Sequence, residues 1–474
     1  MNKKIYISNF INNIAKERDY WINKNSYYYY LLKRIFKFNI TGLNPKILEI
    51  GSGTGFLLDC LTKDNGTGID ISDEMIAISK EKYPNHTFIK MDAEKKSLED
   101  KYEYIILSDT IGYFGDIQTA FNKIHKVCSK DTRIIINSHS FLWRPILSLA
   151  SLLKLKMPNP NLNWLNGYDI KNLLDISGFE VIKETRHILC PIRIPIISFI
   201  INKFFAKLPL INKLCLVYLI VARSLNKDIV SNVKKKSVSI IIPAQNEKDN
   251  IENAVKRMPR LGSHTEIIFI EGCSKDGTYE EMKRVAEKYS PDWDIKYFKQ
   301  DNKGKADAVW KGFHKSQGEI LMILDSDLTV MPEELVKFYD MIEKNKGEYI
   351  QGTRLVYPME KEAMRTLNLI ANKIFSLLFT WLLDRPIRDT LCGTKVISKS
   401  NWLKLFKNRA YFGDFDPFGD FELLFGAYKL NLKFVEIPVQ YKARKYGNIE
   451  IKRFTHGILL LKMFFFALKK IKFA

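Results

Sequence analysis

Several features are absent from this 474-residue chain, and each absence excludes a class of protein. The six cysteines are scattered and no two form a C-x-x-C pair, which argues against a disulfide framework and a zinc site and fits a reducing cytosol. The first 21 residues contain no apolar core long enough for a secretory signal. No internal repeat is visible. We therefore expect a cytoplasmic protein.

No apolar run reaches the roughly 20 residues needed to span a bilayer. The longest candidate, at 457–474, is interrupted and carries four lysines: Lys462, Lys469, Lys470 and Lys472. This pattern predicts a helix that lies in the membrane interface. The net charge of +21 adds attraction to a polyanion, either nucleic acid or an anionic membrane surface, although a lysine-rich solvated surface would also account for it. We expect a peripheral location at the inner face of the cell membrane.

The chain is too long for one hydrophobic core, and its hydrophobic content of 46% is ordinary for folded domains. Two domains of about 200 residues are the expectation. The patterns described below place a first domain at 1–225, a linker at 226–237, a second domain at 238–450 and a basic amphipathic segment at 451–474.

Strand-like and helix-like segments alternate through both halves, which predicts βαβ units and parallel sheets covered by helices on both faces. An apolar region at 192–222 is broken by prolines and lysines, so we expect cap helices there, with a membrane-facing patch as the alternative. Predicted strands of the first half lie at 46–50, 66–71, 87–90, 103–107 and 133–137. In the second half a strand begins at Val238, and others lie at 266–270, 295–298, 319–324 and 348–351.

A glycine-rich turn follows the first predicted strand, in the sequence ILEIGSGTGF. Gly51, Gly53 and Gly55 allow a tight turn and a close approach of a ligand to the backbone. Glu49 precedes them and can orient the loop or meet a cationic ligand. Asp70 ends the next strand, where its carboxylate can accept two ribose hydroxyls, and Asp92 ends the third, where it can meet an adenine amino group.

The first half resembles the class I S-adenosylmethionine-dependent methyltransferases, because its glycine spacing is GxGxG rather than the GxGxxG of dinucleotide oxidoreductases. The resemblance implies a Rossmann-like fold in which the turn cradles the methionine part, the acid after the second strand holds ribose and the acid after the third lies beside adenine. An NAD-binding domain or an inactive methyltransferase is the alternative. The cofactor-binding residues so expected are Glu49, Gly51, Gly53, Gly55, Asp70 and Asp92.

The acceptor side of this first site has fewer signals. Methyl transfer to a hydroxyl needs a base, and the candidates at strand ends are Asp109 and His139. A lone histidine is more often a hydrogen-bonded or surface residue. No Asn/Asp-Pro-Pro-Tyr run occurs, which disfavours methylation of adenine N6.

In the second half, Asp325 and Asp327 follow a buried strand with one residue between them. In extended geometry this spacing points both carboxylates to the same side, where they can share one hard divalent cation. Such a cation neutralises a diphosphate and makes it a better leaving group. A solvated loop is the alternative for an isolated Asp-x-Asp.

The surrounding motifs resemble glycosyltransferase family 2, whose fold is the GT-A nucleotide-diphospho-sugar transferase domain. They occur in order: IIPAQNE, SKDGT, KGKADAVWKGF, DSD, RDTLCGTK and the acceptor-side segment containing FGDFE and QYKAR. The resemblance implies nucleotide-sugar contacts at Pro243, Glu247, Glu271, Asp276, Lys305 and Asp325, Mg²⁺ or Mn²⁺ at Asp325 and Asp327, and catalytic residues at Asp389, Asp420 and Glu422.

Within that family the chain is most similar to the polyprenyl-phosphate (dolichol-phosphate type) sugar transferases, which use a lipid phosphate to displace the nucleotide with inversion. Lys395, Lys442 and Arg444 are then candidates for holding the acceptor phosphate. Two segments depart from the family pattern. Residues 271–274 read EGCS in place of Asp-Asp-Gly-Ser, which leaves the nucleotide base open, and residues 393–395 read GTK in place of Gly-Phe-Arg.

The leading hypothesis is a bifunctional transferase of glycan or glycolipid biosynthesis. It would use S-adenosylmethionine, a divalent metal and a nucleotide-sugar donor on a lipid-phosphate or glycan acceptor, in contact with an anionic membrane. The alternative is an RNA or small-molecule methyltransferase with a non-catalytic sugar-nucleotide-binding domain. Because no RNA-binding module is recognisable, nucleic acid is the disfavoured partner.

Overall fold

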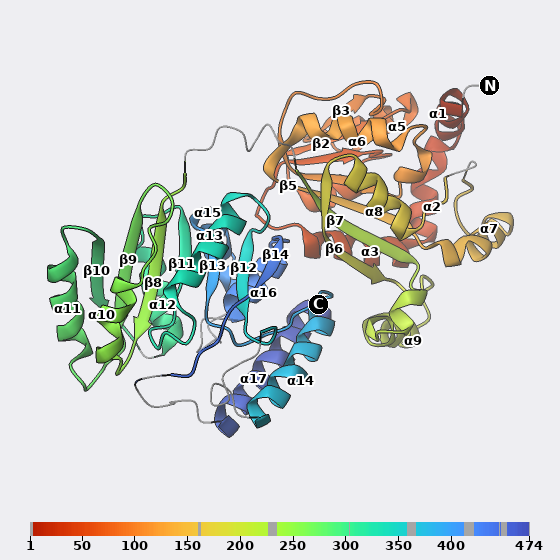
Figure 1. Cartoon of the computed structure of the whole chain (residues 1–474). Coiled ribbons are helices and arrows are strands. Elements are labelled where there is room, and N and C mark those ends of the chain that lie inside the picture. Colours follow the sequence, from red (N-terminus) through yellow and green to blue (C-terminus); the bar gives the residue numbers. More distant parts are fainter. Residues whose placement is uncertain are drawn as a thin grey trace. The chain divides into compact units, whose positions relative to one another are not determined.

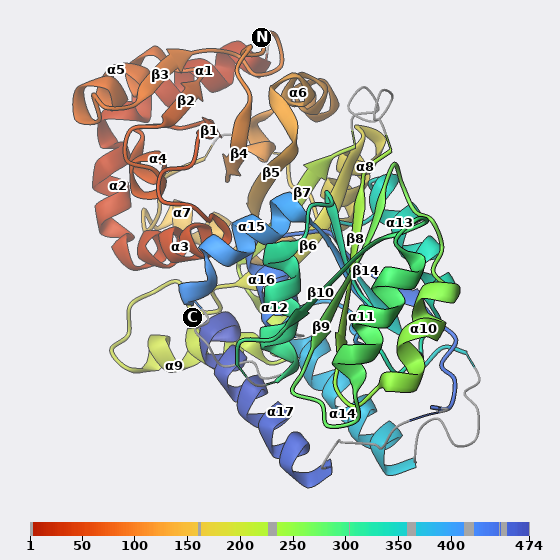
Figure 2. The same ribbon diagram turned by 90° about the vertical axis from the view of Figure 1, so that its left-hand side faces the viewer.

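The computed structural model describes residues 3–159, 163–225, 235–302, 304–357, 366–411, 421–444, 446 and 453–473. The chain divides into two compact units, Met1–Ile229 and Val230–Ala474, each with its own seven-stranded sheet and its own core (Figures 1 and 2). Both are α/β, as predicted.

The sheet of the first unit has the order β3-β2-β1-β4-β5-β7-β6. Strands β1 to β5 are parallel, whereas β7 runs antiparallel to both of its neighbours. The strands are β1 (Ile47–Ile50), β2 (Gly66–Asp70), β3 (Thr87–Lys90), β4 (Tyr102–Ser108), β5 (Cys128–His139), β6 (Phe179–His187) and β7 (Val217–Ser224).

The predicted parallel arrangement therefore holds for β1 to β5 but not for β7. The assignment of the end of the 192–222 region to a cap or a membrane patch was wrong. Every residue of β7 is buried. Its first six residues, VYLIVA, form a continuous apolar run without alternation, which is typical of a strand covered on both faces. The prolines and lysines upstream concealed this strand within a longer apolar stretch.

Helices cover both faces of this sheet, as predicted. Along β1, Ile47 belongs to one apolar cluster while Leu48 and Ile50 belong to another, so successive side chains enter cores on opposite faces. Local caps begin several helices: Ser72 Oγ accepts the N–H of Met75 at the start of α5. The helices are α1 (Lys3–Ile14), α2 (Arg18–Lys24), α3 (Ser26–Asn39), α4 (Phe56–Leu61), α5 (Asp73–Lys82), α6 (Ile117–Ile124), α7 (Arg144–Leu152), α8 (Gly167–Ile176) and α9 (Ile197–Lys203).

The sheet of the second unit has the order β10-β9-β8-β11-β13-β12-β14, in which only β13 runs against its neighbours. Its strands are β8 (Val238–Ala244), β9 (Thr265–Glu271), β10 (Asp294–Lys299), β11 (Ile320–Ile323), β12 (Tyr349–Thr353), β13 (Lys395–Ser398) and β14 (Phe434–Pro438). The five strands predicted in this half are confirmed. Its helices are α10 (Lys248–Lys256), α11 (Thr278–Tyr289), α12 (Lys305–Lys315), α13 (Leu335–Glu343), α14 (Thr366–Leu382), α15 (Lys399–Lys407), α16 (Phe421–Lys429) and α17 (Arg453–Ala467).

Helices α14 and α17 lie side by side (Figures 1 and 2). The rings of Phe379 and Phe464 meet between them at 6.1 Å, and Lys472 forms an ion pair with Asp384 just beyond α17. Each helix of the pair also exposes apolar residues, including Leu377 at 71% on α14 and Phe465 at 62% on α17. Among the described residues, no helix is long and apolar enough to cross a membrane.

Candidate active sites

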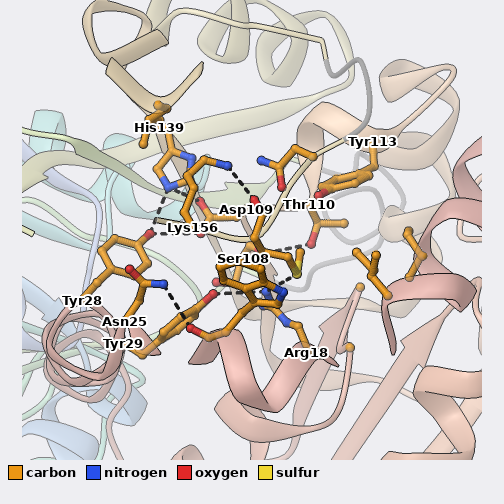
Figure 3. Close-up of a pocket in the computed structure, with 18 of the residues that line it drawn as sticks. Arg18, Asn25, Tyr28, Tyr29, Ser108, Asp109, Thr110, Tyr113, His139 and Lys156 are labelled. Carbon is orange, nitrogen blue, oxygen red and sulfur yellow. Dashed lines mark hydrogen bonds and ion pairs between the residues drawn. The ribbon is translucent and has the colours of Figure 1, made fainter. Parts of the chain in front are cut away.

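The first unit contains a cavity of about 550 Å³ at the carboxyl ends of its parallel strands (Figure 3). Most of the site residues predicted in this half line it: Gly51, Gly53, Asp70, Asp92, Asp109 and His139. Glu49 and Gly55 are not among the lining residues. They meet because parallel strands deliver their carboxyl ends to one edge of a sheet, which is the usual ligand crevice of a wound α/β fold.

The glycine turn is a backbone cradle that other residues would not fit. Gly51 and Gly53 have φ of 75° and 53°. A Cβ on Gly51 would lie 2.5 Å from Thr110 Oγ1, whereas one on Gly53 would meet only Arg18 Nε, at 3.9 Å. The first position therefore excludes a side chain sterically, while the second keeps the backbone open toward the cavity.

Asp70 is buried and its two carboxylate oxygens anchor the turn. One accepts the N–H of Gly53 at 2.9 Å and the other accepts the N–H of Ser72 at 3.0 Å. Burial raises the pKa of Asp70 above its usual range, although these hydrogen bonds act against the shift. A carboxylate offers about four acceptor positions, so Asp70 retains acceptor capacity for a ligand hydroxyl.

Asp92 also lines the cavity, where its carboxylate pairs with Lys4 Nζ at 2.8 Å. Glu49 lies on β1 directly before the glycines and is only 3% exposed, and its Oε2 has no hydrogen-bond partner. Burial raises the pKa of Glu49 to about 8, against a hydrogen bond from Leu58, with repulsion from Asp70 acting in the same direction as burial.

The two candidate bases, Asp109 and His139, come together in the acceptor part of the cavity. His139 Nε2 lies 3.7 Å from Asp109 Oδ1, and the hydroxyl of Tyr28 lies 3.1 Å from both His139 Nε2 and Asp109 Oδ2 (Figure 3). Asn137 Nδ2 donates to Asp109 Oδ1 at 2.8 Å. Asp109 has a positive φ of 52°, an unusual backbone conformation that is typical of functional sites.

Sequence reasoning missed Tyr28 and Arg18, which reach the cavity from the N-terminal helices. The Arg18 guanidinium donates to Tyr29 at 3.1 Å. Burial opposes the charge of Arg18, but nearby Tyr29, Tyr113 and Asp109 hold its pKa above the usual value. The run of four tyrosines at 27–30 was the only sequence signal, and it reads equally well as a packed helix face.

These residues fit S-adenosylmethionine. The cavity has the volume of a cofactor site, its backbone turn requires glycine at Gly51, and the carboxylates that line it suit a cationic ligand.

In the second unit, Asp325 and Asp327 follow β11 as predicted, and each carboxylate meets a cation. Lys305 Nζ lies 2.6 Å from Asp325 Oδ1, and Arg444 donates to Asp327 Oδ2 at 2.9 Å. Burial acts to raise the pKa of Asp325, but the ammonium of Lys305 more than offsets this and holds it below the usual range. A Cβ on Gly393 would come within 2.0 Å of Asp325, so only glycine allows this approach.

Glu247 is the third acid at this place. Arg444 lies 3.4 Å from its Oε1, so one guanidinium bridges Glu247 and Asp327. Burial raises the pKa of Glu247 despite a hydrogen bond from Asn250. Carboxylate oxygens are the ligands that Mg²⁺ and Mn²⁺ prefer, and Mg²⁺ commonly takes one or two carboxylates with phosphate oxygens completing its shell. Asp325 and Asp327 therefore fit such an ion.

The loops around these acids hold the other predicted nucleotide-sugar contacts. Glu271, at the end of β9, accepts the N–H of Ser274 and is buried, and Asp276 accepts the N–H of Lys248 at 3.2 Å. Pro243 lies in β8. These contacts rigidify the loops after β8 and β9, while Lys305 begins α12 and reaches Asp325.

The predicted acceptor-side residues are held in specific pairs. Asp389 is fully buried and accepts two hydrogen bonds from the Arg354 side chain, at 2.7 and 2.9 Å. Burial opposes ionisation, but this guanidinium holds the pKa of Asp389 well below its usual range. Glu422 pairs with Arg409.

Of the three expected phosphate-binding cations, Arg444 contacts two of the acids through its guanidinium. Lys395 is 2% exposed and donates to the carbonyl of Cys392, and the backbone N–H of Lys442 donates to Thr329. The predicted catalytic residue Asp420 lies outside the described residues.

Two family models match the chain. Residues 20–184 match "Methyltransferase domain" and residues 239–411 match "Glycosyl transferase family 2". The chain thus joins a methyltransferase domain with a Rossmann-like fold to a family 2 glycosyltransferase domain with the GT-A fold, as the two resemblances in the sequence implied.

Curated relatives match each domain separately. The chain is similar to a dolichol-phosphate mannosyltransferase of Pyrococcus furiosus, with 32% identity over 25% of this chain and 33% of that enzyme. It is similar to a UDP-N-acetylglucosamine–dolichyl-phosphate N-acetylglucosaminyltransferase of Methanococcus voltae, with 25% identity over 48% of this chain and 97% of that enzyme. A demethylmenaquinone methyltransferase of Chlorobaculum tepidum is 36% identical over 18% of this chain and 36% of that enzyme. The chain therefore aligns with only about a third of the length of the Pyrococcus and Chlorobaculum enzymes.

Proposed function

We propose that the chain is a bifunctional enzyme of glycan or glycolipid biosynthesis. Its second unit transfers a sugar, with inversion, from a nucleotide sugar to an acceptor for which polyprenyl phosphate is the leading candidate. Its first unit transfers a methyl group from S-adenosylmethionine to a hydroxyl of a glycan or related acceptor. The observation that carries the proposal is that motif residues of the first unit line one cavity, while in the second unit Lys305 and Arg444 reach the paired acids Asp325 and Asp327.

For methyl transfer, S-adenosylmethionine supplies an electrophilic methyl group, and the chain must position a hydroxyl and remove its proton. Because an ionised carboxylate only accepts hydrogen bonds, Tyr28 donates to Asp109, and the tyrosine oxygen then accepts from His139 Nε2. This arrangement leaves Nδ1 of His139 as the proton acceptor. When bound, S-adenosylmethionine would supply the methyl group, and the imidazole of His139 would accept the proton of the acceptor hydroxyl.

For sugar transfer, a divalent ion at Asp325 and Asp327 would neutralise the diphosphate leaving group. Asp325 and Asp327 would hold the ion, and Arg444, which pairs with Asp327 in this structure, would then be available to a phosphate. Asp389 is a poor proton acceptor because Arg354 stabilises its ionised form. An acceptor that is already anionic, such as a lipid phosphate, has no proton to lose and therefore suits a site in which Asp389 is a weak base.

Lipid phosphate implies a membrane surface, which we assign to the α14–α17 pair. The pair exposes Leu377 and Phe465, and the lysines Lys462, on α17, and Lys469, just beyond it, are exposed as well. The competing account is that α17 only packs on the catalytic unit. The contact between the rings of Phe379 and Phe464 agrees with that account in part. We place the protein at the inner face of the cell membrane.

The proposal is tested by mass spectrometry of the lipid-linked and polysaccharide fractions of cells with and without the gene. Loss of a methylated glycan together with its lipid-linked precursor supports it. Restoring the gene with Asp70→Ala should return the sugar without its methyl group, and with Asp327→Ala should return neither. Unchanged fractions in the deleted strain would refute the proposal.

A further inference from the structure

Two segments of the first unit expose apolar side chains at a density not found elsewhere in its described residues. Eighteen large apolar side chains are exposed here, seven in 141–155 and eleven in 192–214. They are Phe141, Leu142, Ile146, Leu149, Leu152, Leu153 and Leu155, and Ile192, Ile194, Ile196, Ile197, Phe199, Ile200, Phe204, Phe205, Leu208, Leu210 and Leu214. Folded monomers rarely leave so large an apolar surface in contact with water, and where they do it marks an interaction site.

The helices of these segments are surface elements rather than cover for the sheet. No residue of α7 is buried, and Figure 1 shows α7 and α9 projecting from the body of the unit. The indole N–H of Trp143, just before α7, donates to the carbonyl of Leu214 at 2.8 Å, which joins the two segments. We call the exposed surface of 141–155 and 192–214 the apolar face.

The charged residues of the two segments that form this face are all basic. Neither segment contains an aspartate or a glutamate, whereas they carry six basic residues: Arg144, Lys154, Arg193, Lys203, Lys207 and Lys213. An apolar surface interspersed only with cations complements an anionic bilayer, into which the apolar side chains insert while the cations reach the head groups. A protein partner would have to supply both an apolar groove and a wholly acidic rim.

The apolar face surrounds the acceptor end of the cavity. Trp143, Ile146 and Leu147 line the cavity from one segment, and Pro191 and Ile192 line it from beside the other. A head group that entered between them would pass from the bilayer directly to the proposed base.

Charged residues stand at the inner end of that path. A second, smaller cavity of about 330 Å³ adjoins the first and is lined by Asp109, His139, Arg144 and Lys156. Arg144 therefore belongs both to the apolar face and to the wall beside the base. Two cations next to a base suit a hydroxyl carried close to a phosphate or another anionic group.

We propose that the methyltransferase unit docks on an anionic bilayer through the apolar face, and that its methyl acceptor is a hydroxyl on the anionic head group of a membrane-borne amphiphile. The second part rests on the proposed methyl transfer, in which the O–C bond forms, the C–S bond breaks and the proton passes to His139. The first part is independent of it.

Docking is tested by flotation of the full chain with phosphatidylcholine vesicles, with and without phosphatidylglycerol. The test variant carries Leu152→Glu, Phe199→Glu and Leu210→Glu, all exposed and none lining either cavity. Each substitution removes an apolar side chain that would insert and adds a negative charge that anionic lipid repels, so we expect at least a tenfold loss of binding to the anionic vesicles. The loss should also appear in a chain that carries Leu377→Glu and Phe465→Glu, because the α14–α17 pair is a separate surface.

The matched control places three glutamates on the same unit but off the face, at Leu43, Tyr168 and Ile176, all of which are exposed. It should float like the wild type. Both variants should bind S-adenosylmethionine with wild-type affinity, which shows that the unit has folded. Wild-type flotation of a folded test variant, or an equal loss in the control, would overturn the docking surface.

The acceptor is tested by incubating the protein and methyl-tritiated S-adenosylmethionine with two fractions of cells that lack the gene, an organic lipid extract in vesicles and the water-soluble glycans. Label in the lipid phase, reduced at least about tenfold in the test variant, supports the amphiphile. Label in the soluble glycans alone, equal in both proteins, overturns the amphiphile but leaves methyl transfer standing. Failure to bind S-adenosylmethionine would instead refute the proposed function and leave the flotation result unaffected.

Discussion

Replacing Glu49 by glutamine should stabilise the first unit at alkaline pH and leave it unchanged at acidic pH. Glu49 is buried on β1, and one of its oxygens has no partner. Burial raises its pKa from the ordinary 4.5 to about 8. The folded protein therefore binds this proton more tightly than the unfolded chain does. Its contribution to stability is complete below pH 4.5 and is lost as the pH rises through 8.

The size of the effect follows from the two pKa values. Between pH 5 and pH 8 the wild type should lose roughly 3–4 kcal/mol relative to Glu49→Gln, because one unit of pKa difference corresponds to about 1.4 kcal/mol. For a unit of this size each kcal/mol moves the melting temperature by about 2–4 °C. The two proteins should therefore melt together at pH 5 and differ by about 6–16 °C at pH 8.

Differential scanning calorimetry at several pH values measures this difference. The unfolding transition of the first unit is identified as the one that S-adenosylmethionine shifts to higher temperature. Glu99→Gln is the control, since Glu99 is exposed on the same unit. Parallel melting curves for wild type and Glu49→Gln from pH 5 to pH 8 would refute the reasoning. So would a variant that is less stable at every pH, because it would show that the carboxylate is ionised and paired.

Three further outcomes are expected. Asp70→Ala should weaken S-adenosylmethionine binding, measured by calorimetry, by about 1.5–3 kcal/mol for each hydrogen bond lost to the carboxylate. Asp70→Asn is the control that keeps an acceptor for the N–H of Gly53. Equal affinity in the alanine variant contradicts the ribose assignment. Hydrolysis of the nucleotide-sugar donor should stop with a chelator and in Asp327→Ala, and full activity in either case excludes the metal role. Arg354→Met leaves Asp389 buried without its cation and should destabilise the second unit by about 3–5 kcal/mol in denaturant unfolding; Arg354→Met with Asp389→Asn should recover part of this, and no recovery would show that the charge is not the cause.

The site residues that follow strands could be predicted from the sequence, because parallel strands all end at the same edge of the sheet. Asp70, Asp109 and His139 were each assigned to the end of a strand, and parallel strands bring those ends together in one cavity. The same reasoning placed Asp325 and Asp327 on one loop after β11.

Residues that reach a site from outside this pattern could not be predicted. Tyr28 and Arg18 enter the cavity because the N-terminal helices pack against the sheet, and no periodicity records that packing. The Arg354–Asp389 pair joins the loop after β12 to the segment before β13, a long-range contact without a local signal. The antiparallel β7 was missed because its apolar run continues from the exposed apolar segment before it.

The central claim is that one chain carries two independent transferase sites. Calorimetric titration with S-adenosylmethionine, and separately with UDP or GDP in the presence of Mn²⁺, tests it directly on the wild type, Asp70→Ala and Asp327→Ala. The account predicts that Asp70→Ala loses affinity for S-adenosylmethionine alone and that Asp327→Ala loses affinity for the nucleotide alone. A wild type that binds only one of the two ligand classes, or a single substitution that abolishes both, would contradict it.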